Sequence, residues 1–232
     1  MRTPRSCFPN SAMNKIDAVI FDLDGTLVRY HGVDFESSWG ALAVAAGVGE
    51  RSQQLFREYF PRRDAYAEWA VKEALLLKGV SVSHVSSQLF PPPYAKGVKE
   101  AVAKLQGRYL MGILSSGIDL VADHVASDLN LSFAWANRLP VEDGCFVGTS
   151  ETVVELWSKA DALEKLALER GLDLRHICFV GDNVNDYAVL QRVGLAIAAN
   201  PKDDTLHEVA DHVISDFAVL PALIRSYEEA TA

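Results

Sequence analysis

The sequence predicts a doubly wound α/β fold with a mainly parallel sheet and an all-helical segment inserted after the first strand. Short apolar runs that end in polar or glycine residues recur along the chain, and such runs are typical of strands buried on both faces. Helical patterns separate these runs, which favours a parallel sheet with right-handed crossovers. The segment 31–90 breaks the alternation, and its apolar residues keep helical spacing in two stretches.

Six apolar runs are predicted to form the strands of the sheet. They are Asp17–Phe21, Tyr109–Leu114, Leu131–Ala134, His176–Val180, Leu195–Ala198 and Asp211–Ile214. Four core helices are predicted, at Ile118–Leu129, Lys159–Arg170, Asn185–Val193 and Val219–Glu229. The pair Asp143-Gly144 between apolar residues predicts a β-hairpin within 139–147.

Two boundaries divide the chain into a core and an insertion. Residues 1–13 are predicted to be a flexible N-terminal extension, because this basic segment leads into no apolar signal sequence. Residues 14–30 and 91–232 form the predicted core. Residues 31–90 form the predicted helical insertion, which ends at the run Pro91–Pro93. We expect Arg29–Gly32 and Pro91–Pro93 to act as hinges for this insertion.

Composition and charge exclude several classes of protein. The 232 residues carry a net charge of −9, with 22 basic and 31 acidic side chains. An acidic chain without a basic run has no general attraction for nucleic acid, so an anionic substrate must be attracted locally. No apolar stretch approaches the roughly 20 residues of a membrane helix. Cys7, Cys145 and Cys178 form no CxxC pair, which favours the cytoplasm over a disulfide or zinc framework.

Polar side chains follow three of the predicted strands. Asp22 and Asp24 follow the first strand, Ser115 follows the second, and Asp182 and Asp186 follow the strand that ends at position 180. Because ligands of open α/β sheets bind at the carboxyl ends of the strands, we expect these side chains to meet. Neighbouring carboxylates repel each other unless a cation lies between them. An oxygen-rich, carboxylate-rich site favours Mg²⁺.

Four motifs resemble those of the haloacid dehalogenase superfamily in its phosphatase branch, and they appear in the family's order along the chain. The segment 22–26, Asp-Leu-Asp-Gly-Thr, looks like the DxDGT signature, and Ser115 falls at the strand-terminal serine of the family. Ser158-Lys159 then resembles its lysine motif, and Gly181–Asp186 resembles the GDxxND motif. The resemblance covers nearly everything after Met13 and implies a Rossmann-like core with an inserted helical cap.

The resemblance implies phosphoryl transfer through an aspartyl-phosphate. Asp22 is the implied nucleophile. Asp24 is the implied acid that protonates the leaving alcohol and then acts as the base on water. Ser115 and Lys159 are implied to hold the phosphoryl oxygens. A carboxylate at position 24 favours a phosphatase over a dehalogenase, because a halide needs no proton when it leaves.

The resemblance also implies a set of ligands for Mg²⁺. They are the side chain of Asp22, the main-chain carbonyl of Asp24 and the side chain of Asp182. Asp186 is implied either to support the metal shell or to orient Lys159. A purely structural function for Asp186 also remains open, because a carboxylate in the first turn of a helix stabilises that helix through its dipole.

Contacts to the substrate are predicted on both parts of the chain. Ser116 and Gly117 are expected to offer backbone N–H groups to the phosphate. Asn185 either contacts the substrate or only turns the chain. The insertion resembles the cap of phosphoserine phosphatases, so Glu36 is a candidate partner for a substrate ammonium. Candidate partners for a substrate carboxylate are Arg57, Arg62 and Arg63.

The sequence departs from that group in three respects. Phosphoserine phosphatases commonly carry serine where Gly25 stands and glycine where Ser116 stands. Their cap also has an acidic residue soon after the first motif, from which Glu36 is displaced by several positions. The predicted function is therefore a Mg²⁺-dependent phosphomonoester hydrolase that acts on a small phosphorylated metabolite, with phosphoserine as one candidate. A phosphotransferase or mutase that uses the same aspartyl-phosphate and a non-catalytic phosphoryl-binding protein are the alternatives. The physiological substrate and the oligomeric state stay open.

Overall fold

The computed structural model of the chain describes residues 14–230, so the predicted extension 1–13 lies outside the described residues. Six strands form one sheet in the order β3-β2-β1-β6-β7-β8, and every pairing in it is parallel. The strands are β1 (Ala18–Phe21), β2 (Leu110–Ile118), β3 (Phe133–Asn137), β6 (Ile177–Gly181), β7 (Leu195–Ala199) and β8 (His212–Ile214). The predicted α/β fold class is confirmed.

Apolar residues on both faces of the sheet explain why the strands read as continuous apolar runs. In β1, Val19 and Phe21 join one core cluster, whereas Ala18 and Ile20 join the other. Successive side chains of a strand point to opposite faces, so a central strand needs apolar residues at every position. Cys178 in β6 is also fully buried.

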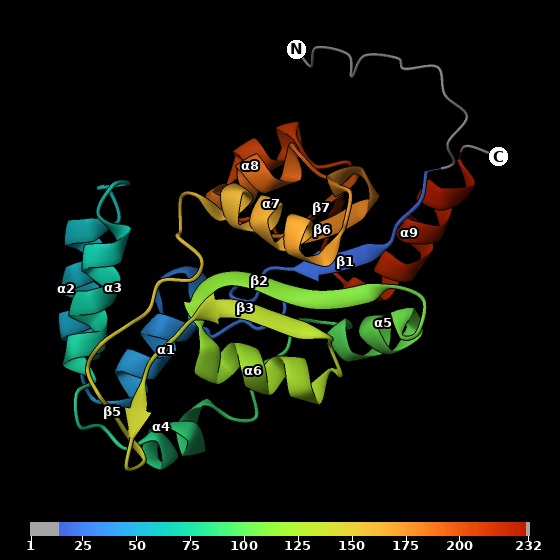
Figure 1. The fold of residues 1–232 in the computed structure, drawn as a ribbon. Coiled ribbons are helices and arrows are strands. Elements are labelled where there is room, and N and C mark those ends of the chain that lie inside the picture. The colour runs from blue at the N-terminus through green and yellow to red at the C-terminus, as the bar shows by residue number, and fades with distance from the viewer. Residues whose placement is uncertain (1–13, 231–232) are drawn as a thin grey trace.

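Five helices cover the two faces of the sheet (Figure 1). Helices α7 and α8 pack on one face, and α5, α6 and α9 pack on the other. Their bounds are α5 (Val98–Leu105), α6 (Asp119–Asp128), α7 (Lys159–Arg170), α8 (Tyr187–Leu190) and α9 (Leu220–Glu229). Among the described residues, no helix has the length and apolarity that crossing a bilayer requires. The cytoplasmic location stays a prediction.

Several predicted elements differ from the observed ones at their ends. Strand β3 starts two residues later than predicted, because Asn130 has a φ of 50° and the N–H of Leu131 closes the end of α6 on Ala126. The predicted helix Asn185–Val193 is shortened to α8, which follows a 3-10 turn, η3 (Val184–Asp186). Helix α5 has no counterpart among the predictions, although its apolar residues keep helical spacing.

Four helices, here called the cap helices, lie between β1 and β2. They are α1 (Ser38–Ala45), α2 (Gly49–Tyr59), α3 (Tyr66–Leu76) and α4 (Val82–Leu89). Helices α1 and α3 carry the two apolar patterns seen in the sequence. Helix α2 was not predicted, because it is mostly polar and has few apolar residues, although these lie on one face. The predicted hinge segments lie side by side, since Arg29 donates its backbone N–H to the carbonyl of Pro93 (2.9 Å).

The predicted hairpin is confirmed as β4 (Val141–Glu142) and β5 (Cys145–Phe146). Its turn residues Asp143 and Gly144 have φ angles of 48° and 75°, as a two-residue hairpin turn requires. The hairpin also bonds to the cap, because Phe146 donates its N–H to the carbonyl of Val80 (3.0 Å) and accepts from Gly79 (2.9 Å). A segment that follows β3 in the core thus supports the end of α3.

The sheet has a tight contact that allows a test of its packing. A Cβ added at Gly112 in β2 would collide with the Phe133 ring of β3. We expect Gly112→Ala to lower the free energy of unfolding by about 1–3 kcal/mol, as overpacking does. Thermal and urea unfolding measure the loss.

The double variant Gly112→Ala/Phe133→Leu distinguishes a collision with the Phe133 ring from a general effect of alanine on the stability of β2. In a Phe133→Leu background, the same Gly112→Ala change is expected to cost less, because the ring is gone. Equal costs in the two backgrounds would contradict the packing account.

Candidate active site

Three carboxylates meet where β1 and β6 end. Strand β1 pairs with β2 on one side and with β6 on the other, so their carboxyl ends share one edge of the sheet. Asp22, Asp182 and Asp186 each offer an oxygen, and these oxygens lie within 4.8 Å of one another. All three residues are buried. The structure thus brings together the carboxylates that the sequence placed at two separate strand ends.

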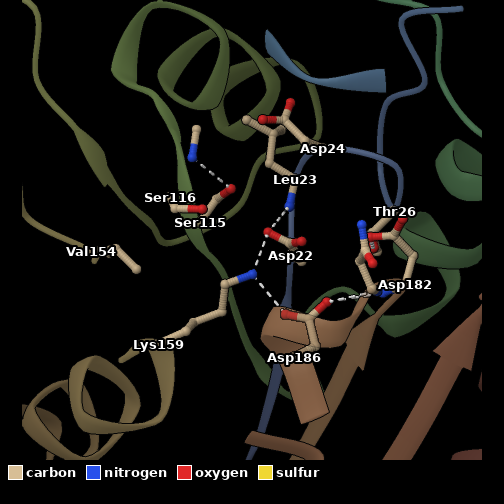
Figure 2. A network of polar contacts seen from close by, with 12 residues as sticks. Asp22, Leu23, Asp24, Thr26, Ser115, Ser116, Val154, Lys159, Asp182 and Asp186 are labelled. Carbon is tan, nitrogen blue, oxygen red and sulfur yellow. Dashed lines mark hydrogen bonds and ion pairs between the residues drawn. The ribbon is translucent and has the colours of Figure 1, made fainter. Parts of the chain in front are cut away.

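Lys159 supplies a positive charge among these carboxylates (Figure 2). Its Nζ lies 3.1 Å from Oδ1 of Asp22 and 2.6 Å from Oδ1 of Asp186. Burial alone would lower the pKa of Lys159, but the carboxylates of Asp186 and Asp22 outweigh it and the pKa is raised. The lysine therefore stays charged. It starts helix α7, where the sequence predicted a helix to begin.

Asp186 is held by a dense set of contacts behind Asp22. Its Oδ2 accepts hydrogen bonds from the backbone N–H groups of Asp182 (3.0 Å) and Asn183 (3.3 Å). A Cβ at Gly181 would collide with this carboxylate. Burial raises the pKa of Asp186, while the Lys159 ammonium opposes the shift. Asp186 thus contacts Lys159 and also belongs to the carboxylate cluster. Both functions that the sequence left open for it stay predictions.

Asp182 contacts one hydroxyl group and one ammonium group within the buried site. Its Oδ1 accepts from the hydroxyl of Thr26 (3.1 Å), and its Oδ2 forms an ion pair with Nζ of Lys202 (2.9 Å). Burial raises the pKa of Asp182, with the Lys202 ammonium opposing. A Cβ at Gly25, where φ is 78°, would collide with Asp182, so serine does not fit at this position.

The donor set fits a divalent cation. Oxygens of three buried carboxylates converge within 4.8 Å of one another. Magnesium prefers carboxylate and carbonyl oxygens. Buried carboxylates need a compensating charge, because an unpaired buried charge is costly. The residues present are therefore suited to hold Mg²⁺.

Asp24 points away from this cluster and toward the cap helices. Its carboxylate accepts hydrogen bonds from the backbone N–H of Ser38 and from the hydroxyl of Ser38, each at 2.8 Å. Burial raises the pKa of Asp24 to about 7, with a further contribution from the charge of Asp22. A carboxyl with this pKa exchanges its proton near neutral pH, which suits a general acid and base. A Cβ at Gly117 would collide with this contact.

The last residues of β2 place Ser115 and Ser116 beside Asp22 (Figure 2). The predicted strand ended at Leu114, but β2 continues to Ile118 with an irregular pairing to β3 between these two residues, so Ser115 lies within the strand. The hydroxyl of Ser115 accepts from the N–H of Gly117 (3.1 Å). The carbonyl of Ser116 accepts from three donors, namely Nε1 of Trp39 (3.1 Å), the hydroxyl of Tyr66 (2.8 Å) and Nδ2 of Asn137 (2.9 Å). This end of β2 is therefore fixed by side chains from both the core and the cap helices.

Sequence reasoning missed several of these residues. Asn137 ends β3 and Lys202 follows β7, so the strand-end rule that selected Asp22 would have found both had the strand ends been placed correctly. Trp39 and Tyr66 had no such signal, because their partner Ser116 lies far away in the sequence. Their aromatic character indicated only a buried helix face.

Glu36 is already surrounded by cationic groups. Its carboxylate lies 2.9 Å from Nε of Arg29, 2.8 Å from Nδ1 of His31 and 3.1 Å from Nζ of Lys202. Although burial opposes it, the contacts with Arg29 and Lys202 lower the pKa of Glu36. Its predicted contact with a substrate ammonium stays a prediction, because these cations already occupy its oxygens.

A cavity of about 920 Å³ opens between the carboxylate cluster and the cap helices. Core residues form its floor, and they include the predicted site residues Asp22, Asp24, Ser115, Ser116, Asp182 and Asn185. Residues of η1 (Asp34–Glu36) and of helices α1, α2 and α3 form much of the remaining wall. The arrangement places the Asp22 carboxylate, which contacts the buried Lys159 ammonium, and carboxylates suited to a cation beside one cavity.

Comparison with known proteins identifies the family. The family described as "Hydrolase: haloacid dehalogenase-like hydrolase" matches residues 16–194. The chain belongs to the haloacid dehalogenase-like hydrolases. Within this family, the chain is 31% identical over 195 residues to a phosphoserine phosphatase of Methanocaldococcus jannaschii, covering 83% of this chain and 89% of that protein. A phosphoserine phosphatase of Archaeoglobus fulgidus is 30% identical, and the match covers 85% of this chain but 56% of that longer protein.

Solved structures of this hydrolase family agree with the sequence comparison. A phospho-aspartyl intermediate analogue of phosphoserine phosphatase superimposes with a TM-score of 0.74 at 29% identity, covering 90% of this chain and 99% of that one. A substrate-bound phosphoserine phosphatase complex superimposes with a TM-score of 0.73 at 28% identity, covering 90% and 97% of the two chains. The predicted family, its phosphoserine phosphatase-like group and the predicted enzyme class, a phosphatase, are confirmed.

The buried ion cluster of this hydrolase allows a test of its electrostatics. Lys159→Met leaves the Asp186 carboxylate without its cation, and removing one partner of a buried pair costs about 3–5 kcal/mol. We expect a loss of this size in metal-free protein at pH 8. The loss should be smaller at pH 5, because burial raises the pKa of Asp186 and the protonated carboxyl needs no cation.

Thermal unfolding in EDTA at both pH values measures this effect. Lys165→Met, on the exposed face of the same helix, is the matched control and should change stability little at either pH. A loss for Lys159→Met that does not depend on pH would contradict the electrostatic account.

Proposed function

We propose that this chain hydrolyses a small phosphomonoester through an aspartyl-phosphate formed on Asp22. The observation that carries the proposal is the position of Asp22, which lies within 4.8 Å of two further carboxylates and 3.1 Å from the Lys159 ammonium. Phosphoryl transfer needs an aligned nucleophile and neutralisation of the charge on the transferred group. This edge of the sheet offers both.

Each residue of the site has a task in this proposal. A carboxylate oxygen of Asp22 attacks phosphorus, and the bond from phosphorus to the alcohol oxygen breaks. Lys159 and Ser115 hold the phosphoryl oxygens as charge develops on them. Ser116 and Gly117 follow Ser115 near the end of β2. Asn185 lines the cavity. Water then attacks the phosphorus, which releases inorganic phosphate and restores Asp22.

Asp24 moves the proton in both steps. The neutral carboxyl donates its proton to the leaving alcohol, and the resulting carboxylate accepts a proton from the attacking water. The Asp24 carboxylate accepts two hydrogen bonds from Ser38, so the position of this acid depends on the first turn of α1. Burial and the raised pKa keep part of the carboxyl protonated near neutral pH.

Magnesium would be held by Asp22, Asp182 and the main-chain carbonyl of Asp24, with Asp186 supporting this set. When bound, the ion neutralises charge on the phosphoryl group and on the carboxylates. We further propose that residues 31–90 form a cap over a core of residues 14–30 and 91–232, and that the cap keeps water out during the first step. The side-by-side connections at Arg29 and Pro93 support this division.

The relatives named phosphoserine phosphatase make phosphoserine the reference substrate. Hydrolysis and transfer to a second alcohol share every residue described above. The two reactions differ in their product, which is inorganic phosphate or a new phosphoester. Measuring both products with phosphoserine and simple alkyl phosphates tests which reaction dominates.

Asp22→Asn tests the nucleophile directly. An amide does not form the aspartyl-phosphate, so we expect turnover with Mg²⁺ to fall on the order of 10³-fold or more. Phosphate release from a phosphomonoester panel is the measurement, and EDTA should abolish the activity of the unchanged protein. Full activity of Asp22→Asn would refute the proposed mechanism.

Asp24→Asn tests whether Asp24 donates the proton, by comparing substrates whose leaving groups differ in their need for it. Loss of a general acid costs about 10²–10⁴-fold, and the cost should be largest for an alkyl phosphate, whose alkoxide leaves poorly. For p-nitrophenyl phosphate, whose phenolate needs little protonation, the first step should slow by less than about tenfold. Pre-steady-state release of the alcohol measures this step.

The exposed Asp123→Asn on α6 serves as the control and should leave both rates unchanged. Equal losses for the two leaving groups in Asp24→Asn would show that Asp24 acts in another way.

A further inference from the structure

The cavity over Asp22 is larger and more aromatic than phosphate chemistry requires. Its volume of about 920 Å³ lies near the upper end of the range of roughly 300–1,000 Å³ for small-molecule sites. Seven aromatic side chains line it, namely Phe35, Trp39, Phe56, Phe60, Tyr66, Trp69 and Trp157. We call this set the aromatic wall.

The rings of the aromatic wall form a continuous surface. The ring centre of Phe56 lies 5.3 Å from that of Phe35, 5.1 Å from that of Phe60 and 5.7 Å from that of Trp69. Trp157 extends the surface beyond Phe60, with 5.3 Å between their ring centres. Phe56, Phe60 and Trp69 remain partly exposed in the absence of a ligand, so their apolar surface is open to a partner.

The aromatic wall begins beside Ser115 and Ser116 of β2. Trp39 and Tyr66 donate hydrogen bonds to the carbonyl of Ser116, one residue after Ser115. Tyr66 continues the wall to Trp69, with 6.0 Å between the ring centres. A phosphoryl group placed at Asp22 would therefore have these rings as the neighbours of its organic part.

The charges around the cavity do not match an amino acid. The charged side chains of its cap wall are Asp34, Glu50, Glu73 and Arg51. Arg51 is exposed, and Glu73 is buried and accepts from Nε1 of Trp69 at 2.9 Å. Three carboxyl groups and one exposed guanidinium disfavour a substrate carboxylate at this wall.

The arginines predicted to meet a substrate carboxylate have other partners. Arg57 donates to Gln53 (2.9 Å), Arg62 stacks on a tyrosine ring, and Arg63 stacks on the outer part of the aromatic wall at Trp157. None of the three lines the cavity. Glu36, the candidate partner for an ammonium, is bound by cations of this chain.

Phe35 has an unusual backbone conformation, in which its ring packs against the other rings of the aromatic wall. Its φ is 56°, in the left-handed region that non-glycine residues seldom adopt. In this conformation its ring contacts Phe60, with 4.9 Å between the ring centres, while its carbonyl accepts from Nζ of Lys202 (3.0 Å). An observed backbone outlier beside a binding cavity is a common sign of function.

We propose that the substrate is a phosphomonoester whose alcohol carries an aromatic ring system and no carboxylate. The ring lies against Phe56, Phe60 and Trp69, where offset or edge-on ring contacts are favourable. The phosphoryl group lies at Asp22. This substrate class rests on the proposed phosphatase function, and Phe56 is its principal specificity-determining residue because it contacts three other rings of the wall.

Three esters of primary alcohols test the proposal with the unchanged protein and Mg²⁺. They are 2-phenylethyl phosphate, n-propyl phosphate and O-phospho-L-serine. The first two have alkoxide leaving groups of similar basicity, so a difference between them reports binding of the ring. We expect kcat/KM for 2-phenylethyl phosphate to exceed that for each of the others by about tenfold or more.

Phe56→Leu removes the ring and keeps an apolar side chain of similar reach. We expect it to lower kcat/KM for 2-phenylethyl phosphate about fivefold or more, mainly through KM, and to change n-propyl phosphate by less than about twofold. Phe133→Leu, a core change outside the cavity wall, is the matched control and should leave the preference intact. Far-UV circular dichroism checks that both variants fold.

A binding measurement on the unchanged protein does not depend on any variant. (2-Phenylethyl)phosphonate should inhibit more tightly than n-propylphosphonate and should change the tryptophan fluorescence, because three of the four tryptophans line the cavity. Equal inhibition by the two phosphonates, or a preference for phosphoserine, would overturn the substrate class while leaving the phosphatase function in place. Release of no phosphate from any ester would instead refute the proposed function, and the substrate class with it.

Discussion

The mutual repulsion of three buried carboxylates at one edge of the sheet is the constraint on which the rest of the site depends. Asp22, Asp182 and Asp186 lie within 4.8 Å of one another, and two ammonium groups, of Lys159 and Lys202, contact them. Unbalanced buried charge is costly, so this edge retains a strong preference for a cation. The same preference explains the glycines at positions 25 and 181, because only a residue without Cβ lets the carboxylates approach their partners.

The core and the cap meet at this charged edge through a small number of directed contacts. Asp24 accepts from Ser38 at the start of α1, and the carbonyl of Ser116 accepts from Trp39 and Tyr66. The residues to which we assign the chemistry therefore also contact the cap helices. In the proposed mechanism, the acid Asp24 links proton transfer to the helices that would keep water out, because its carboxylate bonds to Ser38 of α1.

The floor and the wall of the cavity differ in their chemistry. The floor holds carboxylates and the serines of β2, which suit phosphoryl transfer, whereas the wall consists of aromatic rings, most of them from the cap helices and η1. Rings that contact each other at 4.9–5.7 Å form a surface suited to a planar, apolar group. Membership of the phosphoserine phosphatase-like group thus fixes the reaction type more firmly than the organic part of the substrate.

The sequence alone determined the alternation of strands and helices and the positions of Asp22 and Asp182 directly after two strands, whose carboxyl ends meet at one edge because the strands are parallel. Ser115 was also predicted to follow a strand, but β2 continues to Ile118 and contains it. Only the tertiary structure decided the partners of these residues. Thr26 bonds to Asp182 across 156 positions, and Asn137 bonds to Tyr66 across 71; no local pattern encodes such pairs. The polar helix α2 shows the same limit, since its Phe56 joins the aromatic wall only when η1 and α3 pack against it.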